Sequence, residues 1–504
     1  MVSRPAFAVA AGHRLTAEAA AEVLGAGGTA VDATIAGALV ACVAEPALAS
    51  LFGGGFLMAR SAEGRVGLLD FFVQTPRARA DERDIDLRAI EADFGDVKQV
   101  FHIGAASIGA PGVPRGLHEA HARMGRTPFA ELAAPAVRLA KEGAPLSGFQ
   151  AEVLRIIAPI IAASPASLAL LGDGEAPLTA GAPYRNPALA DVIETYAREG
   201  DRFCHEGEAA QALLSLDGGH LSALDLRRYQ AIWREPMRES RAGAILHLNP
   251  PPALGGALIG FALRMLRREA DPAEVALALD QTARARLETG IGEDPAAGAL
   301  RLLAPDLVER YRRDLMGRRA AIRGTTHISA IDRRGAGAAL TLSNGSGSGV
   351  IAPGTGIMPN NMLGEEDLVG ADLLGWAEDR RLSSMMAPMA ICRPDGGFAM
   401  LGSGGSNRIR SARVQVAAHL LDRGMRLEKA VAAPRIHVEA WPEADFEDRF
   451  RNDERAALIA AFPEARGWAE PSMFFGGVHA TARDARGAVE AAGDHRRDGA
   501  AIIG

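Results

Sequence analysis

A run of apolar residues near the start of the chain constrains the fold more than any other feature of the sequence. Residues 29–44, TAVDATIAGALVACVA, carry one charge, on Asp32, and the run ends at Glu45 and Pro46. This pattern predicts a helix with no polar face, which must be buried. Its uncharged part, residues 33–44, is far shorter than the ~20 residues that a membrane crossing requires. We therefore expect a core that encloses a helix, and no membrane span.

Hydrophobic periodicity predicts further elements in the first two thirds of the chain. Helical spacing is found in residues 15–24, 115–142 and 206–217, and strand-like patterns are found in residues 66–73 and 244–249. Helices and strands are thus interleaved, with helices in the majority.

The character of the chain changes near residue 324. Residues 305–324 form a polar stretch with six arginines, which suits a solvated helix or an exposed segment. Residues 325–331 and 338–343 then show the alternating pattern of polar and apolar side chains that is typical of strands. A turn lies between them at residues 332–335. This pattern predicts a β-hairpin whose first strand begins at Thr325.

Composition excludes several classes of function. The chain of 504 residues is 48% hydrophobic with a formal net charge of −7, so neither a disordered polymer nor a basic nucleic-acid-binding surface is expected. The three cysteines, Cys42, Cys204 and Cys392, lack metal-binding spacing, and the GAGGTA motif at residues 25–30 follows a helix instead of a strand. We expect no metal, cofactor, nucleic acid or membrane partner. The N-terminal residues make a poor secretory signal, which predicts a cytoplasmic location.

The segment IRGTTHISAID at residues 322–332 is the best candidate for chemistry. Acyl transfer requires a nucleophile, a base and donors to the developing oxyanion. A threonine freed at a chain start supplies the first two groups. Its hydroxyl attacks, and its α-amine, with an ordinary pKa of about 7.7 to 8.0, accepts the proton. A lone threonine at a strand start is usually structural. A catalytic role for Thr325 therefore depends on the glycine- and serine-rich motifs that follow it.

Several blocks, in order along nearly the whole chain, resemble the gamma-glutamyltranspeptidase family. The resemblance implies a self-cleaving N-terminal-nucleophile hydrolase of the α+β class, with a four-layer αββα sandwich. It also implies a cut between Gly324 and Thr325, into a large subunit, 1–324, and a small catalytic subunit, 325–504, that remain together as a heterodimer. The blocks are GGTAVDATIAGALVACVAEPALASLFGGGFLMA at 27–59, GAPGVPRGLHEAHARMG at 109–125, NPPPALGG at 249–256 and TTH at 325–327.

The resemblance assigns roles to individual residues. Thr325 matches the nucleophile, and Ser343 stands where the family has a threonine hydroxyl that assists it. Gly404 and Gly405 match the pair whose backbone N–H groups form the oxyanion hole. The serine pair that contacts the carboxylate of the donor is matched by Ser383 and Ser384.

The expected substrate pocket departs from the family pattern. In DFFVQTP, at residues 70–76, Phe72 occupies the position of an arginine that clamps the carboxylate of the donor. A charge-assisted contact of this kind contributes about 1.5 to 3 kcal/mol, so a free α-carboxylate is expected to bind less well. Three arginines are candidates to compensate: Arg77, Arg79 and Arg408.

The residues expected to hold the amine of the donor also differ. The segment with the family's asparagine is shortened near Asn344, and Met362 is a substitution in NNMLGEED. Glu365 or Glu366 stands where an aspartate usually binds the amine. The connection from residue 367 to 381 is too short for a large lid, which predicts an open mouth.

Three functions are consistent with the sequence. The first is a self-processing amidohydrolase or acyltransferase that acts on a gamma-glutamyl amide such as glutathione, through an acyl ester on Thr325. The second is an amidase similar to cephalosporin acylases, because Phe72 favours a more apolar acyl group. The third is a non-catalytic binding or scaffold protein that keeps the fold and is never cut. Either enzyme would act on a small-molecule amide.

Overall fold

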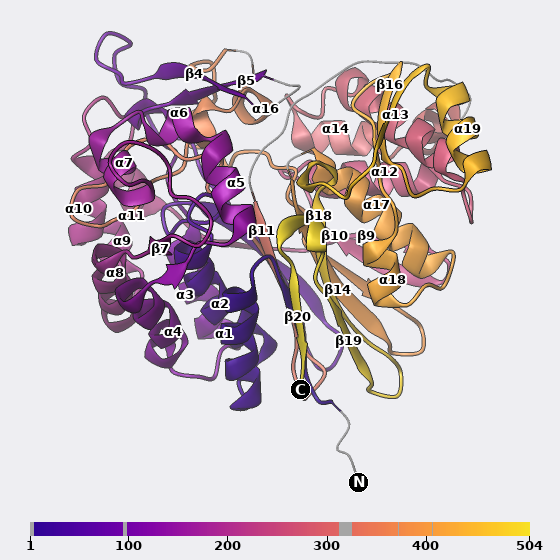
Figure 1. Cartoon of the computed structure of the whole chain (residues 1–504), viewed down its shortest axis with the longest axis horizontal. Helices are drawn as coiled ribbons and strands as arrows, with labels where there is room; N and C mark the ends of the chain where they lie inside the picture. Colours follow the sequence, from indigo (N-terminus) through magenta and orange to yellow (C-terminus); the bar gives the residue numbers. More distant parts are fainter. Residues whose placement is uncertain (1–4, 94–97, 312–324, 371, 406) are drawn as a thin grey trace.

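Two stacked β-sheets with helices on both outer sides form the body of the protein (Figure 1). The computed structural model describes residues 5–93, 98–311, 325–370, 372–405 and 407–504. Residues 312–324 of the predicted polar stretch, including Gly324, lie outside the described residues, and the stretch begins with helix α15. The α+β class and the four-layer αββα sandwich expected from the sequence are confirmed.

The first sheet has seven strands, and each neighbouring pair is antiparallel. The predicted hairpin lies at its centre, and the strand predicted at 66–73 is also present. In spatial order the strands are β20 (Ala500–Ile503), β1 (Ala8–Ala11), β11 (Thr326–Ile331), β12 (Gly337–Ser343), β2 (Gly54–Arg60), β3 (Val66–Phe71) and β8 (Ile232–Arg234).

The second sheet has six antiparallel strands and lies against the first through β14 and β18, which contact β11. It includes the strand predicted at 244–249. In spatial order the strands are β19 (Val489–Ala492), β18 (Gly477–Arg483), β14 (Phe398–Gly404), β13 (Met389–Cys392), β10 (Ala244–Leu248) and β9 (Met237–Arg241).

Helices from the first half of the chain cover the outer face of the first sheet, on the left of Figure 1. The pattern at 115–142 is divided into two helices, because Gly125 ends the first and Pro128 caps the second. The helices on this side are α1 (Arg14–Gly25), α2 (Ala30–Ala44), α3 (Val113–Met124), α4 (Phe129–Glu142), α5 (Gly148–Ile156), α6 (Ala158–Ile161), α7 (Pro165–Leu171), α8 (Pro187–Glu199), α9 (Arg202–His205), α10 (Glu208–Leu214) and α11 (Ala223–Arg228).

Helices from the second half of the chain lie mainly against the second sheet, on the right of Figure 1. The remaining short strands form small separate sheets. The helices are α12 (Gly255–Met265), α13 (Pro272–Glu288), α14 (Pro295–Leu302), α15 (Pro305–Tyr311), α16 (Glu366–Val369), α17 (Arg408–Leu421), α18 (Leu427–Ala432) and α19 (Asn452–Ala461). The strands are β4 (Arg88–Asp93), β5 (Lys98–Ile103), β6 (Ala144–Pro145), β7 (Pro183–Tyr184), β15 (Ile436–His437), β16 (Glu443–Glu447) and β17 (Glu464–Trp468).

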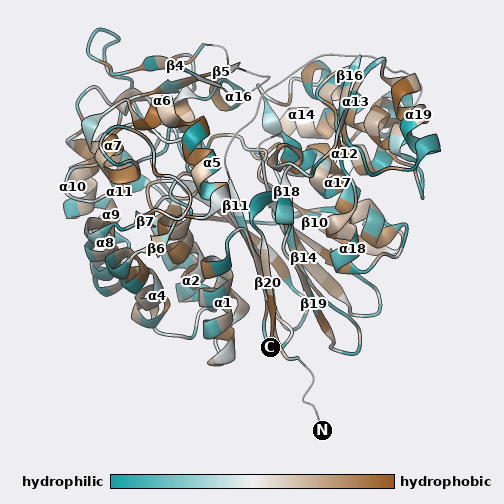
Figure 2. Ribbon diagram, viewed as in Figure 1, coloured by the Kyte–Doolittle hydropathy of each residue, from teal (hydrophilic) through white to brown (hydrophobic). Residues whose placement is uncertain are grey.

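Helix α2 is buried, as its composition predicts. Fourteen of its fifteen residues are buried in the core between the first sheet and its helices. Thr29 caps the start of the helix: its side chain accepts the N–H of Asp32, and the Asp32 carboxylate accepts the N–H of Thr29. Separate apolar clusters fill the space between the sheets and the space under α12 and α17. Hydrophilic residues gather on outer helices such as α8 and α19 (Figure 2).

No helix in the described part of the chain combines the length and the apolar character that a membrane crossing requires.

Candidate active site

The register of the first sheet places Thr325 beside Ser343. Thr326 pairs with Leu342 across β11 and β12, so the next position brings Thr325 opposite Ser343. Both residues are nearly buried, with 5% and 6% of their surface exposed. The hairpin predicted from sequence therefore positions two of the predicted catalytic hydroxyl groups side by side.

The side chain of Thr325 faces the second sheet. His327, two residues along β11, lies against Gly402 of β14, where a Cβ atom would come 2.2 Å from the imidazole. Alternation along the strand places Thr325 on the same face. At Gly404 a Cβ atom would lie 2.1 Å from the carbonyl oxygen of Thr325, and Gly405 has a φ of 120°, which glycine adopts without strain. The fold thus brings the predicted nucleophile to the predicted oxyanion glycines.

The loop after Ser343 is folded on itself by polar contacts. Ser343 Oγ accepts the N–H of Gly345 at 3.0 Å, and Asn344 Nδ2 donates to the carbonyl oxygen of Met358 at 3.2 Å. A Cβ atom at Gly345 would lie 2.7 Å from Oε1 of Glu365. This buried carboxylate therefore lies against the loop, and the structure brings Ser343, Asn344 and Glu365 together.

A cavity of about 1100 Å³ lies between residues 366–383 and the end of α13. Glu366 and Ser383 line it, together with much of the short connection at 367–381. Ser384 and Thr325 are not among its lining residues, and Ser384 Oγ accepts the N–H of Met386 at 3.1 Å. The other charged and aromatic lining residues include Arg234, Arg286, Trp376, Arg380 and Arg381.

Phe72 lies just beyond β3, in the apolar layer between the sheets. Its ring stacks on Phe56 with centroids 5.4 Å apart, and only 2% of its surface is exposed. Its carbonyl oxygen accepts hydrogen bonds from the hydroxyl of Tyr229 and from Arg381, a guanidinium that also lies 3.6 Å from Asp70. A guanidinium group therefore reaches the backbone at this position from another segment. The antiparallel bridge between residues 74 and 381 places it there.

The three arginines expected to compensate for Phe72 have other partners. Arg77 pairs with Asp379 at 2.6 Å, and the guanidinium of Arg79 lies 4.8 Å from the ring centre of Trp376. Arg408 is buried at the start of α17, 3.4 Å from Glu439. Its burial lowers the pKa of the guanidinium.

The model of the gamma-glutamyltranspeptidase family matches residues 16–504. The chain belongs to this family. It is an enzyme, a gamma-glutamyltransferase-family amidohydrolase, and the resemblance inferred from the sequence blocks is confirmed.

The similar proteins include an acylase and a glutathione hydrolase. The chain is 28% identical to the acylase ACY 1 proenzyme of Pseudomonas sp. (strain V22), over 98% of this chain and 93% of that protein. It is also 28% identical to the glutathione hydrolase proenzyme of Pseudomonas aeruginosa, over 98% of this chain and 94% of that protein. The crystal structure of a cephalosporin acylase from Bacillus halodurans is similar in fold, with a TM-score of 0.84 at 21% identity over 99% of this chain and 96% of that chain.

Two ionisable residues from other segments, Glu45 and Arg497, contact the start of β11. Neither contact was expected from the family resemblance. Glu45 accepts the hydroxyl hydrogen of Thr326 at 2.6 Å, and Arg497 donates to the carbonyl oxygen of Thr325 at 3.3 Å. Both are buried: burial raises the pKa of Glu45 to about 7 and lowers that of Arg497 to about 10. The sequence holds one signal for Glu45, since it is an ionisable residue directly after a helix that must be buried.

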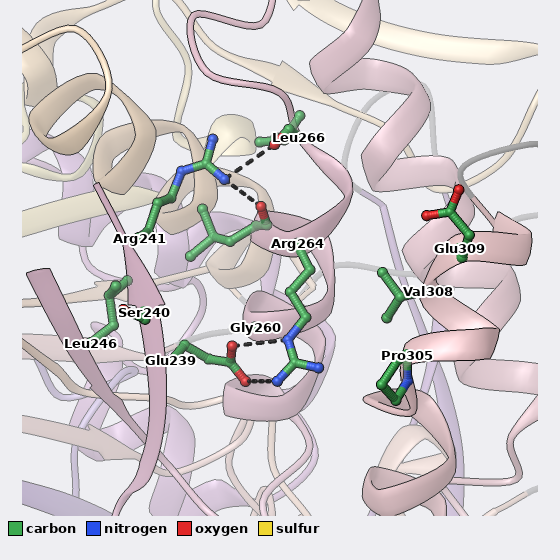
Figure 3. A pocket seen from close by; sticks show the side chains of 11 residues that line it. Glu239, Ser240, Arg241, Leu246, Gly260, Arg264, Leu266, Pro305, Val308 and Glu309 are labelled. Atoms are coloured by element: carbon green, nitrogen blue, oxygen red, sulfur yellow. Dashed lines mark hydrogen bonds and ion pairs between the residues drawn. The ribbon is translucent and has the colours of Figure 1, made fainter. Parts of the chain in front are cut away.

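A second pocket, of about 470 Å³, lies at the outer edge of the second sheet between β9, α12 and α15 (Figure 3). Its charged side chains are paired with other groups of the protein. Arg264 pairs with Glu239 at 2.6 Å, and Arg241 pairs with Asp422 at 2.5 Å. None of the candidate active-site residues lines this pocket. Among the described residues, no group of three or more His, Cys, Asp and Glu side chains is placed to hold a metal ion.

Proposed function

We propose that the protein is a self-processing amidohydrolase that uses Thr325 as its nucleophile. The observation that carries this proposal is the position of Thr325, which lies opposite Ser343 with its carbonyl oxygen against Gly404. The name proenzyme, which the acylase and glutathione hydrolase relatives share, supports processing. Scission of the Gly324–Thr325 bond frees the α-amine of Thr325 and yields fragments 1–324 and 325–504, which remain together as a heterodimer.

The reaction proceeds through an ester. The hydroxyl oxygen of Thr325 attacks the carbonyl carbon of the amide while the α-amine takes the hydroxyl proton. The C–N bond then breaks, the leaving amine receives that proton, and the acyl group remains on Thr325. Water or a second amine attacks the ester and restores the hydroxyl. The N–H groups of Gly404 and Gly405 stabilise the oxyanion, a role in which one donor contributes about 3 to 4 kcal/mol.

Processing and catalysis are tested together by Thr325→Ala, with Thr325→Ser as its matched control. We expect the wild type to give two fragments on a denaturing gel and a chain whose sequence begins Thr-Thr. Thr325→Ala leaves no hydroxyl to attack Gly324, so it stays uncut, whereas Thr325→Ser retains part of the processing. Intact mass spectrometry after incubation with amides detects the acyl adduct. An uncut, inactive wild type would favour the non-catalytic alternative.

The first candidate for the acyl donor is a gamma-glutamyl amide such as glutathione. The relative named glutathione hydrolase proenzyme supports this donor. Glu365, buried against the loop after Ser343, is the candidate to bind the amine of the donor, and Ser383, in the wall of the cavity, is the candidate to contact its carboxylate.

A second candidate is an acyl group other than gamma-glutamyl, such as glutaryl, which lacks the α-amine of glutamate. Phe72 favours it, because the family's arginine is replaced by a ring that stacks on Phe56. The relative named acylase ACY 1 proenzyme supports it as well. Turnover of gamma-glutamyl and glutaryl anilides separates the two donors. If Phe72 weakens carboxylate binding, we expect a KM for the gamma-glutamyl compound about 10- to 150-fold above that of an enzyme with the arginine. Activity on the glutaryl compound alone would reject the glutathione donor.

A further inference from the structure

Glu45 is placed to act on the first residues of the catalytic strand. It follows α2 directly, and its carboxylate accepts two hydroxyl groups, from Thr326 at 2.6 Å and from Thr16 of α1 at 2.8 Å. The residue is completely buried. Thr326 is the first residue of β11 and directly follows Thr325, so the anchored residue is bonded to the proposed nucleophile.

The backbone next to this carboxylate leaves room for the contact. A Cβ atom at Gly12 would lie 2.6 Å from the hydroxyl oxygen of Thr326 and 3.1 Å from Oε2 of Glu45. Gly12 also donates its N–H to the carbonyl oxygen of His327 at 3.2 Å. The end of β1 therefore packs on the Glu45–Thr326 contact without a side chain of its own.

Few ionisable groups face Glu45. Arg497, in the segment after β19, favours the charged carboxylate, whereas Asp498 opposes it. Burial and the nearby Glu45 raise the pKa of the Cys42 thiol to about 12, so this group is neutral near pH 7. His479 of β18 lies about as close to Gly12 as Glu45 does, and burial lowers its pKa to about 4, so it is neutral near pH 7. No positively charged group within hydrogen-bonding distance of Glu45 is found among the described residues.

The two hydrogen bonds to Glu45 favour its ionised carboxylate, whereas desolvation favours the neutral acid. Both neighbouring hydroxyl groups donate to it, and a carboxylate is an acceptor only. A protonated Glu45 carries a donor on one of its oxygens, and that oxygen becomes a weaker acceptor for the threonine hydroxyl that it binds. Desolvation brings the pKa to about 7, which makes both forms accessible near neutral pH.

We infer that Glu45 is a positioning residue of the reaction: its ionised carboxylate anchors Thr326 and thereby holds Thr325 in line with Gly404. The inference rests on the proposed function, since it requires Thr325 to be the nucleophile. A freed strand start has no preceding residue to restrain it, so the side-chain anchor at the second residue limits its motion. Protonation of Glu45 weakens the anchor. We therefore expect kcat to fall while KM changes little.

The test compares kcat and KM against pH for the processed wild type, Glu45→Gln and Thr326→Val, per mole of cut protein. For both variants we expect kcat at pH 8.5 to fall about 10- to 100-fold while KM stays within about three-fold. In the wild type two protons, on Glu45 and on the α-amine of Thr325, shape the acid side of the kcat profile. In Glu45→Gln only the α-amine remains, so the acid side fits a single proton.

Thr16→Val is the matched control, because it removes the other hydroxyl donor to the same carboxylate. It leaves kcat at high pH within about three-fold of the wild type, and it moves the midpoint of the acid side upward, since the Thr16 hydrogen bond lowers the pKa of Glu45. Wild-type kcat and pH dependence in both Glu45→Gln and Thr326→Val would overturn the inference, as would an equal loss of kcat in Thr16→Val. Absence of an acyl adduct on Thr325 in the wild type would instead overturn the proposed function.

Discussion

Glu45 and Asp494 are two buried carboxylates that both interact electrostatically with Arg497, and their surroundings differ sharply. Glu45 has two hydroxyl donors and no guanidinium in contact. Asp494 binds Arg435 at 2.7 Å and Arg496 at 3.0 Å, and it also accepts the N–H of Val478.

The difference separates a carboxyl group that titrates near neutral pH, Glu45, from one that stays ionised there, Asp494. Two arginines hold the pKa of Asp494 well below its usual range, despite the cost of desolvation. Desolvation outweighs two hydroxyl donors at Glu45 and raises its pKa to about 7. Burial alone therefore does not determine the charge of a carboxylate: the charge of the donors does. Asp494 is suited to hold structure together, and Glu45 is suited to respond to pH.

The strongest test of this contrast is Asp494→Ala. The change leaves Arg435 and Arg496 buried without their shared carboxylate, so we expect the free energy of unfolding to fall by about 3 to 5 kcal/mol. Urea unfolding at pH 7 measures it. Asp453→Ala is the matched control, because it breaks an exposed pair with Arg451 and should leave the urea midpoint unchanged. Equal midpoints for the two variants would contradict the structural role of Asp494.

A smaller effect of opposite sign is expected for Glu45→Gln. The folded protein raises the pKa of Glu45 from 4.5 to about 7, so ionisation disfavours the folded state as the pH rises through this range. The shift corresponds to about 3 kcal/mol at most. Glu45→Gln should therefore be more stable than the wild type at pH 8, by up to this amount, and the advantage should vanish near pH 4.5. Urea titrations at both pH values measure it. A variant that is less stable at pH 8 would contradict the cost of ionising Glu45 in the folded protein.

The smallest effect is expected from Arg497, whose charge acts on both carboxylates. Arg497 lowers the pKa of Glu45, so Arg497→Met should move the midpoint of the acid side of the kcat profile upward, by up to about one pH unit. Arg497→Lys keeps the charge and should move it less. An unchanged midpoint in Arg497→Met would show that the two groups are not coupled.

The sequence predicts the local parts of this site well. The alternating pattern at 325–343 determines the hairpin, and the hairpin register places Thr325 beside Ser343. The composition of residues 29–44 predicts a buried helix, and α2 is buried. The roles of Gly404 and Gly405 came from family resemblance, and the structure places Gly404 against Thr325.

The contacts that the sequence does not reveal join distant segments. Glu45 and Thr326 are 281 positions apart, and Thr325 and Arg497 are 172 apart. No periodicity links such pairs, because they meet only after the layers of the fold pack together. The same reason explains Arg381, which reaches the carbonyl group of Phe72 through a bridge between separate loops. Packing between layers, rather than local propensity, determines these electrostatic surroundings.

The position of β20 at the edge of the first sheet has a practical consequence for handling the protein. β20 pairs with β1, which pairs with β11, and the carbonyl oxygen of Gly504 accepts the N–H of Phe7 at 2.9 Å. Trimming eight residues from the tail would remove this strand together with Arg497. Affinity tags and deletions at the C-terminus, which are harmless in many recombinant proteins, should therefore be checked against catalytic rate before such material is used for assays.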